Sequence, residues 1–134
     1  MTARYDIACN CGEVRFTLTG EPRVRGFCHC SDCRDLLDVP YHSVTAWNKE
    51  QVDVVAGADR ITVFQHPGKQ MKRFFCSSCG ETLFNSNAKD WRVVSQMIIA
   101  KAYGGQLPDA LSAKSHFFYA GRVVDVDDDL PKHD

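Results

Sequence analysis

Apolar and polar residues alternate along most of the chain in short runs that are typical of β-strands. The clearest run is 13–19, in which Val14, Phe16 and Leu18 fall on one face of the expected strand. The same pattern predicts strands at 23–27, 43–47, 51–55, 60–64, 70–75, 81–84, 91–100, 115–119 and 122–126. Turn residues such as those at 20–22 separate the runs. The pattern therefore predicts a mainly β protein.

Helix signals are weak by comparison. One helical turn is expected after Cys33, and another after Leu107, with Pro108 at its first position. The stretch 91–100 is rich in β-branched residues, which favours a strand over a helix there. The acidic segment 125–129 is expected to be solvated. Because no repeat or linker divides the chain, we expect a single domain over residues 1–134.

Composition and charge narrow the function classes. The 134 residues are 44% hydrophobic and 25% charged, as in an ordinary globular protein, and the formal net charge is -1. A protein that binds nucleic acid usually carries a strong excess of basic residues, and this chain has none, so binding of nucleic acid is not expected. No apolar run reaches the roughly 18 residues that a membrane span needs. Residues 1–6 lack the apolar core of a secretion signal, so we expect a cytoplasmic protein with no membrane partner.

Seven cysteines are the unusual feature of the composition. Their number is odd, and disulfides are rare in a reducing compartment, so metal binding or chemistry is the better interpretation. They fall into three clusters: the first holds Cys9 and Cys11, the second holds Cys28, Cys30 and Cys33, and the third holds Cys76 and Cys79.

Two ways of combining these clusters compete. A zinc ribbon would combine the two C-x-x-C pairs, Cys30/Cys33 and Cys76/Cys79, in one zinc site. It would leave Cys9, Cys11 and Cys28 without a role in that site. The alternative joins the first and third clusters in one four-cysteine site and leaves the second as a three-cysteine site. Gly12 and Gly80 directly follow the last cysteines of the first and third clusters, and glycine after a metal-binding turn permits positive φ. This shared pattern favours the division into four and three.

A three-cysteine zinc site has room for a fourth ligand. Closed zinc sites are structural, whereas sites with three protein ligands are usually catalytic. The alternative is that a histidine closes the site and both zinc ions are structural. The candidate histidines are His29, His42, His66 and His116. Three thiolates weaken the Lewis acidity of zinc, so an open site of this kind suits the binding and deprotonation of an incoming thiol.

The motifs around the cysteines resemble those of one known family. Cys9-x-Cys11-Gly12, Cys28-His29-Cys30-x-x-Cys33-Arg34 and Cys76-x-x-Cys79-Gly80, in this order and spacing, are similar to those of the glutathione-dependent formaldehyde-activating enzymes, a family that includes centromere protein V. The resemblance implies a β-tent fold of small antiparallel sheets organised around two zinc ions per chain. It implies a structural zinc ion at Cys9, Cys11, Cys76 and Cys79 and a catalytic one at Cys28, Cys30 and Cys33.

The same resemblance implies an activity and partners. The family is assigned carbon–sulfur lyase activity, with formaldehyde and glutathione forming S-(hydroxymethyl)glutathione, so the expected ligand is glutathione, its adduct or a similar small thiol. The competing hypothesis is a non-catalytic zinc-binding scaffold or protein-interaction module. The enzyme hypothesis predicts that the second zinc ion has an open coordination position that faces a pocket. The scaffold hypothesis predicts either no pocket or a fourth protein ligand that closes the second zinc site.

Overall fold

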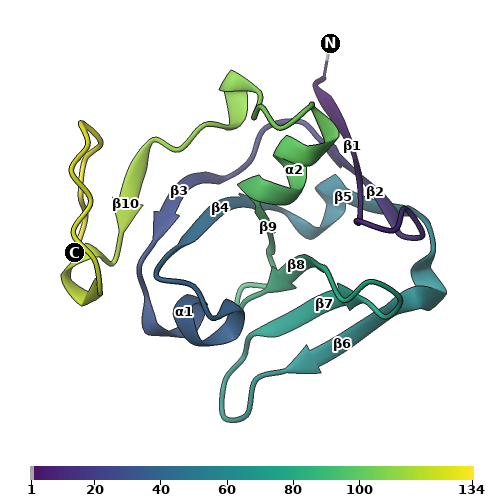
Figure 1. Cartoon of the computed structure of the whole chain (residues 1–134), viewed down its shortest axis with the longest axis horizontal. Coiled ribbons are helices and arrows are strands. Elements are labelled where there is room, and N and C mark those ends of the chain that lie inside the picture. The colour runs from purple at the N-terminus through teal and green to yellow at the C-terminus, as the bar shows by residue number, and fades with distance from the viewer. Residues whose placement is uncertain (1) are drawn as a thin grey trace.

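Two β-sheets make up most of the molecule. The computed structural model describes residues 2–134, and Figure 1 shows them. One sheet has three strands in the order β1-β2-β5, and the other has seven in the order β10-β3-β4-β9-β8-β7-β6. Neighbouring strands are antiparallel except β10 and β3, which are parallel. The prediction of a mainly β chain with antiparallel sheets is confirmed.

The strands are short and most lie where the alternation predicts them. Their bounds are β1 Arg4–Ala8, β2 Arg15–Thr19, β3 Val24–Cys28, β4 His42–Trp47, β5 Val52–Ala56, β6 Ile61–Gln65, β7 Lys72–Cys76, β8 Thr82–Ser86, β9 Arg92–Ser95 and β10 Ser115–Phe117. Two α-helices, α1 Ser31–Leu37 and α2 Gln96–Ala102, and the 3-10 turns η1 Lys49–Gln51, η2 Ala58–Arg60, η3 Asp109–Leu111 and η4 Tyr119–Gly121 complete the described chain.

The main core lies between the two sheets. Phe16 of β2 meets Phe84 of β8 edge to face, with ring centroids 5.5 Å apart. Tyr5 of β1 meets Trp47 of β4 in the same way at 6.2 Å. All four side chains are buried in one apolar cluster. The three-stranded sheet is therefore held to one face of the seven-stranded sheet by aromatic packing, which buries large apolar areas.

A second, smaller core occupies the other face of the seven-stranded sheet. Ala46 and Val93 pair across β4 and β9 and belong to this cluster, whereas their neighbours Trp47 and Val94 belong to the main core. Successive side chains of a strand point to opposite faces, so the two clusters lie on opposite sides of the sheet. The second core also includes Cys33 of α1, and this places α1 on that side.

The prediction of one strand over 91–100 is wrong in its second half. The strand β9 ends at Ser95, and α2 follows at once. The Ser95 hydroxyl accepts a hydrogen bond of 3.1 Å from the Met97 amide, which is the usual N-cap arrangement. The helix buries Ile98 and Ile99 in the main core. The cap and this burial outweigh the strand preference of β-branched residues.

Other expectations need smaller corrections. The helix expected after Cys33 exists but begins earlier, at Ser31. The turn after Leu107 is the 3-10 turn η3, with Pro108 just before it. No strand forms over 122–126, because Arg122 binds Asp125 locally at 2.7 Å and the segment bends. The strand β1 was not expected from the sequence pattern.

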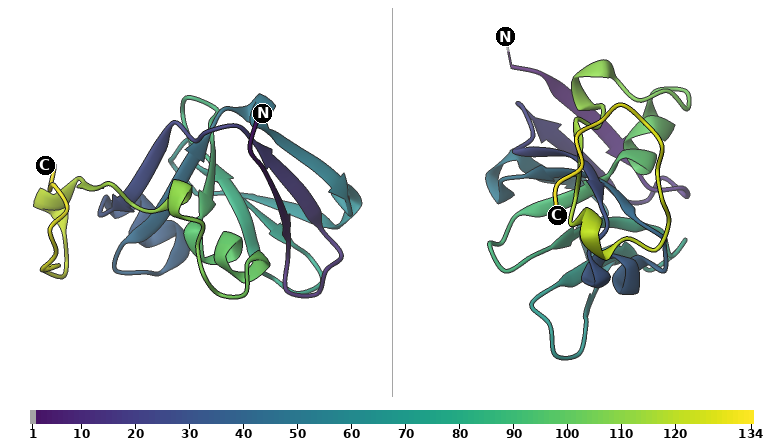
Figure 2. Two further views of the ribbon diagram at one scale, coloured as in Figure 1. Left: turned by 90° about the horizontal axis from the view of Figure 1, so that it is seen from above. Right: turned by 90° about the vertical axis from the view of Figure 1, so that its left-hand side faces the viewer.

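The C-terminal segment lies beside β10, at one edge of the seven-stranded sheet (Figure 2). Its backbone binds that strand through the amide of His116, which donates to the Pro131 carbonyl at 2.8 Å. The His133 amide donates to the His116 carbonyl at 2.9 Å. Within residues 2–134, no helix is both long and apolar enough to cross a membrane.

Candidate functional site

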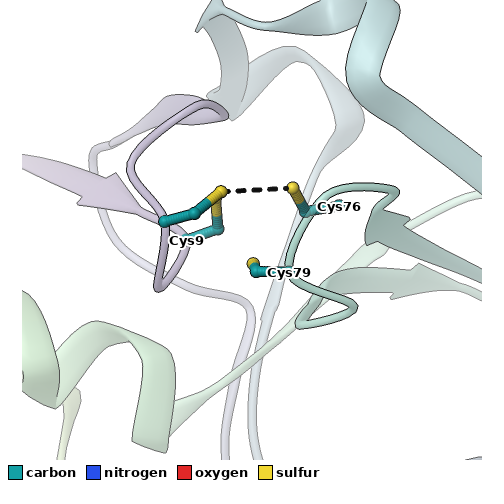
Figure 3. A group of neighbouring side chains, drawn as sticks. Cys9, Cys76 and Cys79 are labelled. Carbon is teal, nitrogen blue, oxygen red and sulfur yellow. Dashed lines mark hydrogen bonds between the residues drawn. The ribbon is translucent and has the colours of Figure 1, made fainter.

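Four cysteines meet where two loops approach each other. Cys9 and Cys11 follow β1, and Cys76 and Cys79 lie between β7 and β8; Figure 3 shows the Cys9, Cys76 and Cys79 sulfurs pointing toward a common centre. All four sulfurs lie within 4.8 Å of one another. Two of the separations are 3.5 Å, from Cys9 to Cys11, and 3.7 Å, from Cys11 to Cys76. Tetrahedral zinc with Zn–S bonds of about 2.3 Å places its sulfurs about 3.8 Å apart, so the group fits this ion.

The two loops share a local geometry. Gly12 and Gly80 both have φ of +78°. The Gly12 amide donates to the Cys9 carbonyl at 2.9 Å, and the Gly80 amide donates to the Cys76 carbonyl at 2.7 Å. The Val14 amide reaches the Cys9 sulfur at 3.4 Å. The positive φ expected after each of these cysteine pairs is therefore present, and it closes each loop tightly enough to present both sulfurs on one side.

The other three cysteines gather at the start of α1. Cys28 ends β3, Cys30 is the N-cap residue of α1, and Cys33 lies in its first turn. The Cys28 sulfur lies 3.4 Å from that of Cys30 and 3.5 Å from that of Cys33. These separations also suit thiolate ligands of one tetrahedral ion. The chain thus brings its cysteines together as four and three, and the zinc-ribbon combination is not formed.

Hydrogen bonds make Cys30 the most acidic thiol of its group. The Cys28 thiol donates to the Cys30 sulfur at 3.4 Å, and this lowers the pKa of Cys30 well below its ordinary value. The Cys33 amide adds a hydrogen bond of 3.3 Å to the same sulfur. The bond to Cys30 raises the pKa of Cys28. A negative charge is therefore concentrated on Cys30, which favours the binding of a cation.

His29 points away from the cysteines that flank it. Its buried ring places Nε2 2.9 Å from Nδ1 of His116, and Nε2 of His116 lies 2.8 Å from the Asp128 carboxylate. A carboxylate only accepts hydrogen bonds, so Nε2 of His116 carries the proton and donates it in a hydrogen bond to Asp128. Nδ1 of His116 is then an acceptor, and it receives a hydrogen bond from the Nε2–H of His29. Burial lowers the pKa of His29 and so favours its neutral form. This chain of hydrogen bonds from His29 through His116 to Asp128, called the relay below, connects the loop between Cys28 and Cys30 to the C-terminal segment. Asp128 is therefore hydrogen-bonded, and is not the freely solvated residue that was expected.

We expect the His116→Phe variant to lose about 1–3 kcal/mol of unfolding free energy, because a ring of similar size leaves the buried His29 N–H without its acceptor. Urea denaturation of the zinc-loaded protein measures the effect. The matched control is His66→Phe, in the turn after β6, where the His66 ring lies 3.3 Å from the carbonyl of its neighbour Pro67. Equal stability of both variants would contradict the relay.

The remaining histidines do not join the three cysteines. His42 is buried on β4 opposite Cys28 in the strand register, and its burial lowers its pKa to about 4. His66 lies in the turn between β6 and β7. In the part of the chain that the structure describes, the group of possible metal ligands at Cys28 holds three cysteines and no histidine or carboxylate.

A cavity of about 590 Å³ opens beside the three-cysteine group, and Cys28, Cys30 and Cys33 all line it. Its walls are mostly apolar and include Val24, Val44, Met71, Trp91, Val93 and Phe118. Such a volume is typical of a small-molecule site. Met71 was not among the site residues expected from the sequence. Nothing in the local sequence around Met71 indicates a binding site, because it is the folding of the seven-stranded sheet that brings this residue to the cavity.

Charged side chains at this cavity are paired. The Lys69 ammonium lies 2.7 Å from the Asp32 carboxylate and 3.4 Å from that of Asp35. The hydrogen bond to Asp32 raises the pKa of Lys69, so the lysine stays charged and its charge is offset by the two carboxylates. Arg23 and Lys89 lie over the ring of Trp91, at 4.6 and 4.9 Å from its centroid. Among the residues that line the cavity, Lys69 and Asp32 thus form an ion pair, whereas Arg23 and Lys89 lie against Trp91 without lining the cavity themselves.

Comparison with known proteins agrees with these features. A family model described as glutathione-dependent formaldehyde-activating enzyme matches residues 4–121. No curated protein matches the chain. Among solved structures, the crystal structure of a Rhodobacter sphaeroides protein is similar, with a TM-score of 0.51 and 23% sequence identity, over 69% of this chain and 85% of that one. At this identity the solved structure supports the fold alone.

Proposed function

Because the chain belongs to the glutathione-dependent formaldehyde-activating enzyme family, we propose that it is a zinc-dependent carbon–sulfur lyase acting on a thiol adduct such as S-(hydroxymethyl)glutathione. The observation that carries this proposal is the group of Cys28, Cys30 and Cys33 at the wall of a cavity of about 590 Å³. Three thiols with no fourth protein ligand among residues 2–134, at a place that a small molecule can reach, suit a catalytic site better than a structural one.

The donor set and its spacing support zinc in both groups. Cys9, Cys11, Cys76 and Cys79 would hold a structural ion that joins the two sheets, as in the β-tent that the family resemblance implies. Cys28, Cys30 and Cys33 would hold the catalytic ion. When bound there, zinc supplies the positive charge that keeps an incoming thiol deprotonated. The proposed enzyme is carried by a single domain of residues 1–134.

The surroundings of the cavity support a thiol such as glutathione as the ligand. Glutathione carries two carboxylates, and Arg23 and Lys89, which lie over the Trp91 ring but do not line the cavity, would bind them outside it. The interior beside the cysteines is mostly apolar, and it suits the small sulfur-bearing end of the molecule. The peptide ends would then lie toward the rim, and the reacting carbon would lie inside.

The proposed reaction needs few groups from the protein. In the synthetic direction the thiolate sulfur attacks the carbonyl carbon of formaldehyde, and a C–S bond forms. The C=O π electrons move to the oxygen, which takes a proton from water and becomes a hydroxyl. The lyase direction reverses each step: the hydroxyl loses its proton, C=O re-forms and the sulfur leaves as thiolate. The chain contributes orientation and an apolar enclosure.

The competing scaffold hypothesis predicts either no pocket or a fourth ligand that closes the second site. His29, the nearest histidine in sequence, is engaged by His116 instead. Both this contact and the adjoining cavity favour the enzyme. Binding of nucleic acid is not part of the proposal, and a cytoplasmic location stays a prediction.

Metal removal tests the proposal directly. We expect two zinc ions per chain by elemental analysis, one of which a mild chelator removes first, because three protein ligands hold it and the cavity exposes it. Activity, followed as formaldehyde released from S-(hydroxymethyl)glutathione, should disappear with that first ion and return on zinc addition, while the circular dichroism spectrum stays unchanged. A fully zinc-loaded protein that releases no formaldehyde would contradict the lyase and favour the scaffold.

A further inference from the structure

The outer edge of β6 lacks the features that close the other edges of the two sheets. The C-terminal segment lies along β10, β1 carries Arg4 and Asp6, and β5 carries Asp53. In contrast, β6 has neither a charged residue nor a proline, and it pairs with β7 without a bulge. Natural proteins protect edge strands with such devices, because an open edge pairs readily with another chain. Within residues 2–134 no strand pairs with this side of β6, and Figure 1 shows it at the border of the molecule.

The ladder between β6 and β7 shows which backbone groups point outward. Just before β6, the Arg60 carbonyl accepts from the Ser77 amide at 2.8 Å, and just after it the His66 amide donates to the Met71 carbonyl at 3.2 Å. In an antiparallel pair, residues that bond the neighbouring strand alternate with residues whose N–H and C=O point away from it. In the observed register, the even-numbered residues of β6 therefore bond β7, and the odd-numbered residues present their backbone groups at the edge.

The odd-numbered residues are Ile61, Val63 and Gln65. The Ile61 amide is used locally, because it donates to the Ala58 carbonyl of the preceding turn. The amides of Val63 and Gln65 and the carbonyls of Ile61 and Val63 remain available at the edge. The side chains there are apolar and accessible, since Val63 is 49% and Phe64 is 44% exposed. The edge thus offers both hydrogen-bonding groups and apolar surface to a further strand.

The two ends of β6 carry opposite charges. At its beginning, Arg60 forms an ion pair with Glu13 at 3.7 Å, and the exposed Asp59 adds a negative charge. At its end, the exposed Lys72 lies opposite Gln65 in the register with β7 and adds a positive charge. Antiparallel pairing of two copies places the acidic end of one beside the basic end of the other. The edge is therefore complementary to itself, and a second copy of the chain is the partner that it fits.

We propose that β6 is a dimer interface, where it pairs in the antiparallel direction with β6 of a second copy about a two-fold axis at Val63. Each Val63 amide donates to the partner's Val63 carbonyl, and each Gln65 amide donates to the partner's Ile61 carbonyl. Phe64 lies opposite the partner's Thr62, and such aromatic and β-branched pairs are favourable. The four hydrogen bonds use the two amides and two carbonyls that each copy presents.

The interface is separate from the proposed lyase chemistry, but it adjoins the candidate site. The turn between β6 and β7 contributes Gly68 and Lys69 to the wall of the cavity beside the three cysteines, and Met71 follows them. Pairing of β6 would hold this hairpin from its outer side and so brace one wall of the cavity in both copies.

Sedimentation velocity of the zinc-loaded full chain tests the interface. Over a series of protein concentrations, the wild type should show an equilibrium between monomer and dimer. Val63→Lys brings two ammonium groups together at the two-fold axis and should raise the dissociation constant of the dimer by about tenfold or more. The matched control is Val55→Lys, the same change on β5 at a residue that is 55% exposed, and it should leave the dissociation constant unchanged.

Amide hydrogen exchange of the wild type provides a readout that needs no variant. The amides of Val63 and Gln65 should exchange quickly in the dilute monomer and slowly at concentrations where the dimer forms. The amides of Thr62 and Phe64 bond β7 in either state, so their protection should change much less. This pattern of alternating residues is specific to pairing at the β6 edge.

Three results would overturn the proposal. They are a wild type that stays monomeric at every concentration, a folded Val63→Lys protein that dimerises as tightly as the wild type, and a dimer whose Val63 and Gln65 amides stay as unprotected as in the monomer. Loss of the dimer in Val55→Lys would place the contact on the three-stranded sheet and would also overturn it. Circular dichroism establishes whether each variant is folded, and if Val63→Lys is not, the exchange of the wild type decides.

Discussion

The Cys76→Ser variant is expected to be unfolded at room temperature. Cys76 is fully buried and belongs to both the four-cysteine group and the main core. Structural zinc contributes on the order of 10 kcal/mol of apparent folding free energy, which is comparable with the whole stability of a domain of this size. Losing that ion therefore removes most or all of the stability of the folded state.

The position of this group explains why its loss spreads through the molecule. The first cysteine pair follows β1 of the three-stranded sheet, and the second lies between β7 and β8 of the seven-stranded sheet. A metal ion bound there would tie the two sheets together beside their shared core. The Asn10 amide donates to Glu81 at 2.8 Å and the Ser78 hydroxyl donates to Glu13 at 2.5 Å between the same two segments, but such exposed contacts cannot replace the ion.

Far-ultraviolet circular dichroism and zinc content measure this effect. The matched control is Ser77→Ala, which changes an exposed neighbour of Cys76 in the same loop and should leave both unchanged. A Cys76→Ser protein with a wild-type spectrum and a cooperative thermal transition near the wild-type temperature would show that the four-cysteine group is not a structural centre.

The Cys30→Ser variant is expected to stay folded and to lose activity by about 10³-fold or more. Loss of a catalytic ion removes several kcal/mol of transition-state stabilisation, which corresponds to this range. The fold should survive because Cys30 is the N-cap of α1, where its sulfur accepts from the Cys33 amide at 3.3 Å. Serine is among the best N-cap residues and can accept the same hydrogen bond.

Zinc stoichiometry and formaldehyde release, measured on the same sample, test this prediction. The zinc content should fall from two to one per chain while the unfolding transition is retained. Ser31→Ala, at the exposed next position, is the control for changes at the helix start and should keep both zinc and activity. Full activity in a Cys30→Ser protein that holds one zinc ion would refute a catalytic role for this group.

The two expected phenotypes differ because the groups occupy different places. The four-cysteine group joins the sheets, so its loss should abolish the fold. The three-cysteine group lies on the outer face of one sheet, beside a cavity, so its loss should abolish only the chemistry. A protein in which both variants unfold would have two structural centres, as the scaffold hypothesis holds.

Strand positions were predictable where local alternation decides them. The run at 13–19 forms β2 because its apolar residues face the main core. The alternation failed at 91–100, because the local Ser95 cap was missed and the burial of Ile98 and Ile99 is a tertiary effect that a β-branched sequence does not show. The prediction from alternation also missed β1, a short strand that is stabilised by its antiparallel pairing with β2.

By itself the sequence determined the mainly β class and favoured the division of the cysteines into four and three, which the structure then showed. Both follow from short-range chemistry: side-chain alternation within a strand, and glycines that turn the chain directly after Cys11 and Cys79. The tertiary structure alone decided that His29 turns from the cysteines to His116, and that Asn85 and Trp91 meet Cys30 at one cavity. Strand register and α1 bring those residues together across 55 or more positions, and no local pattern encodes such a distance.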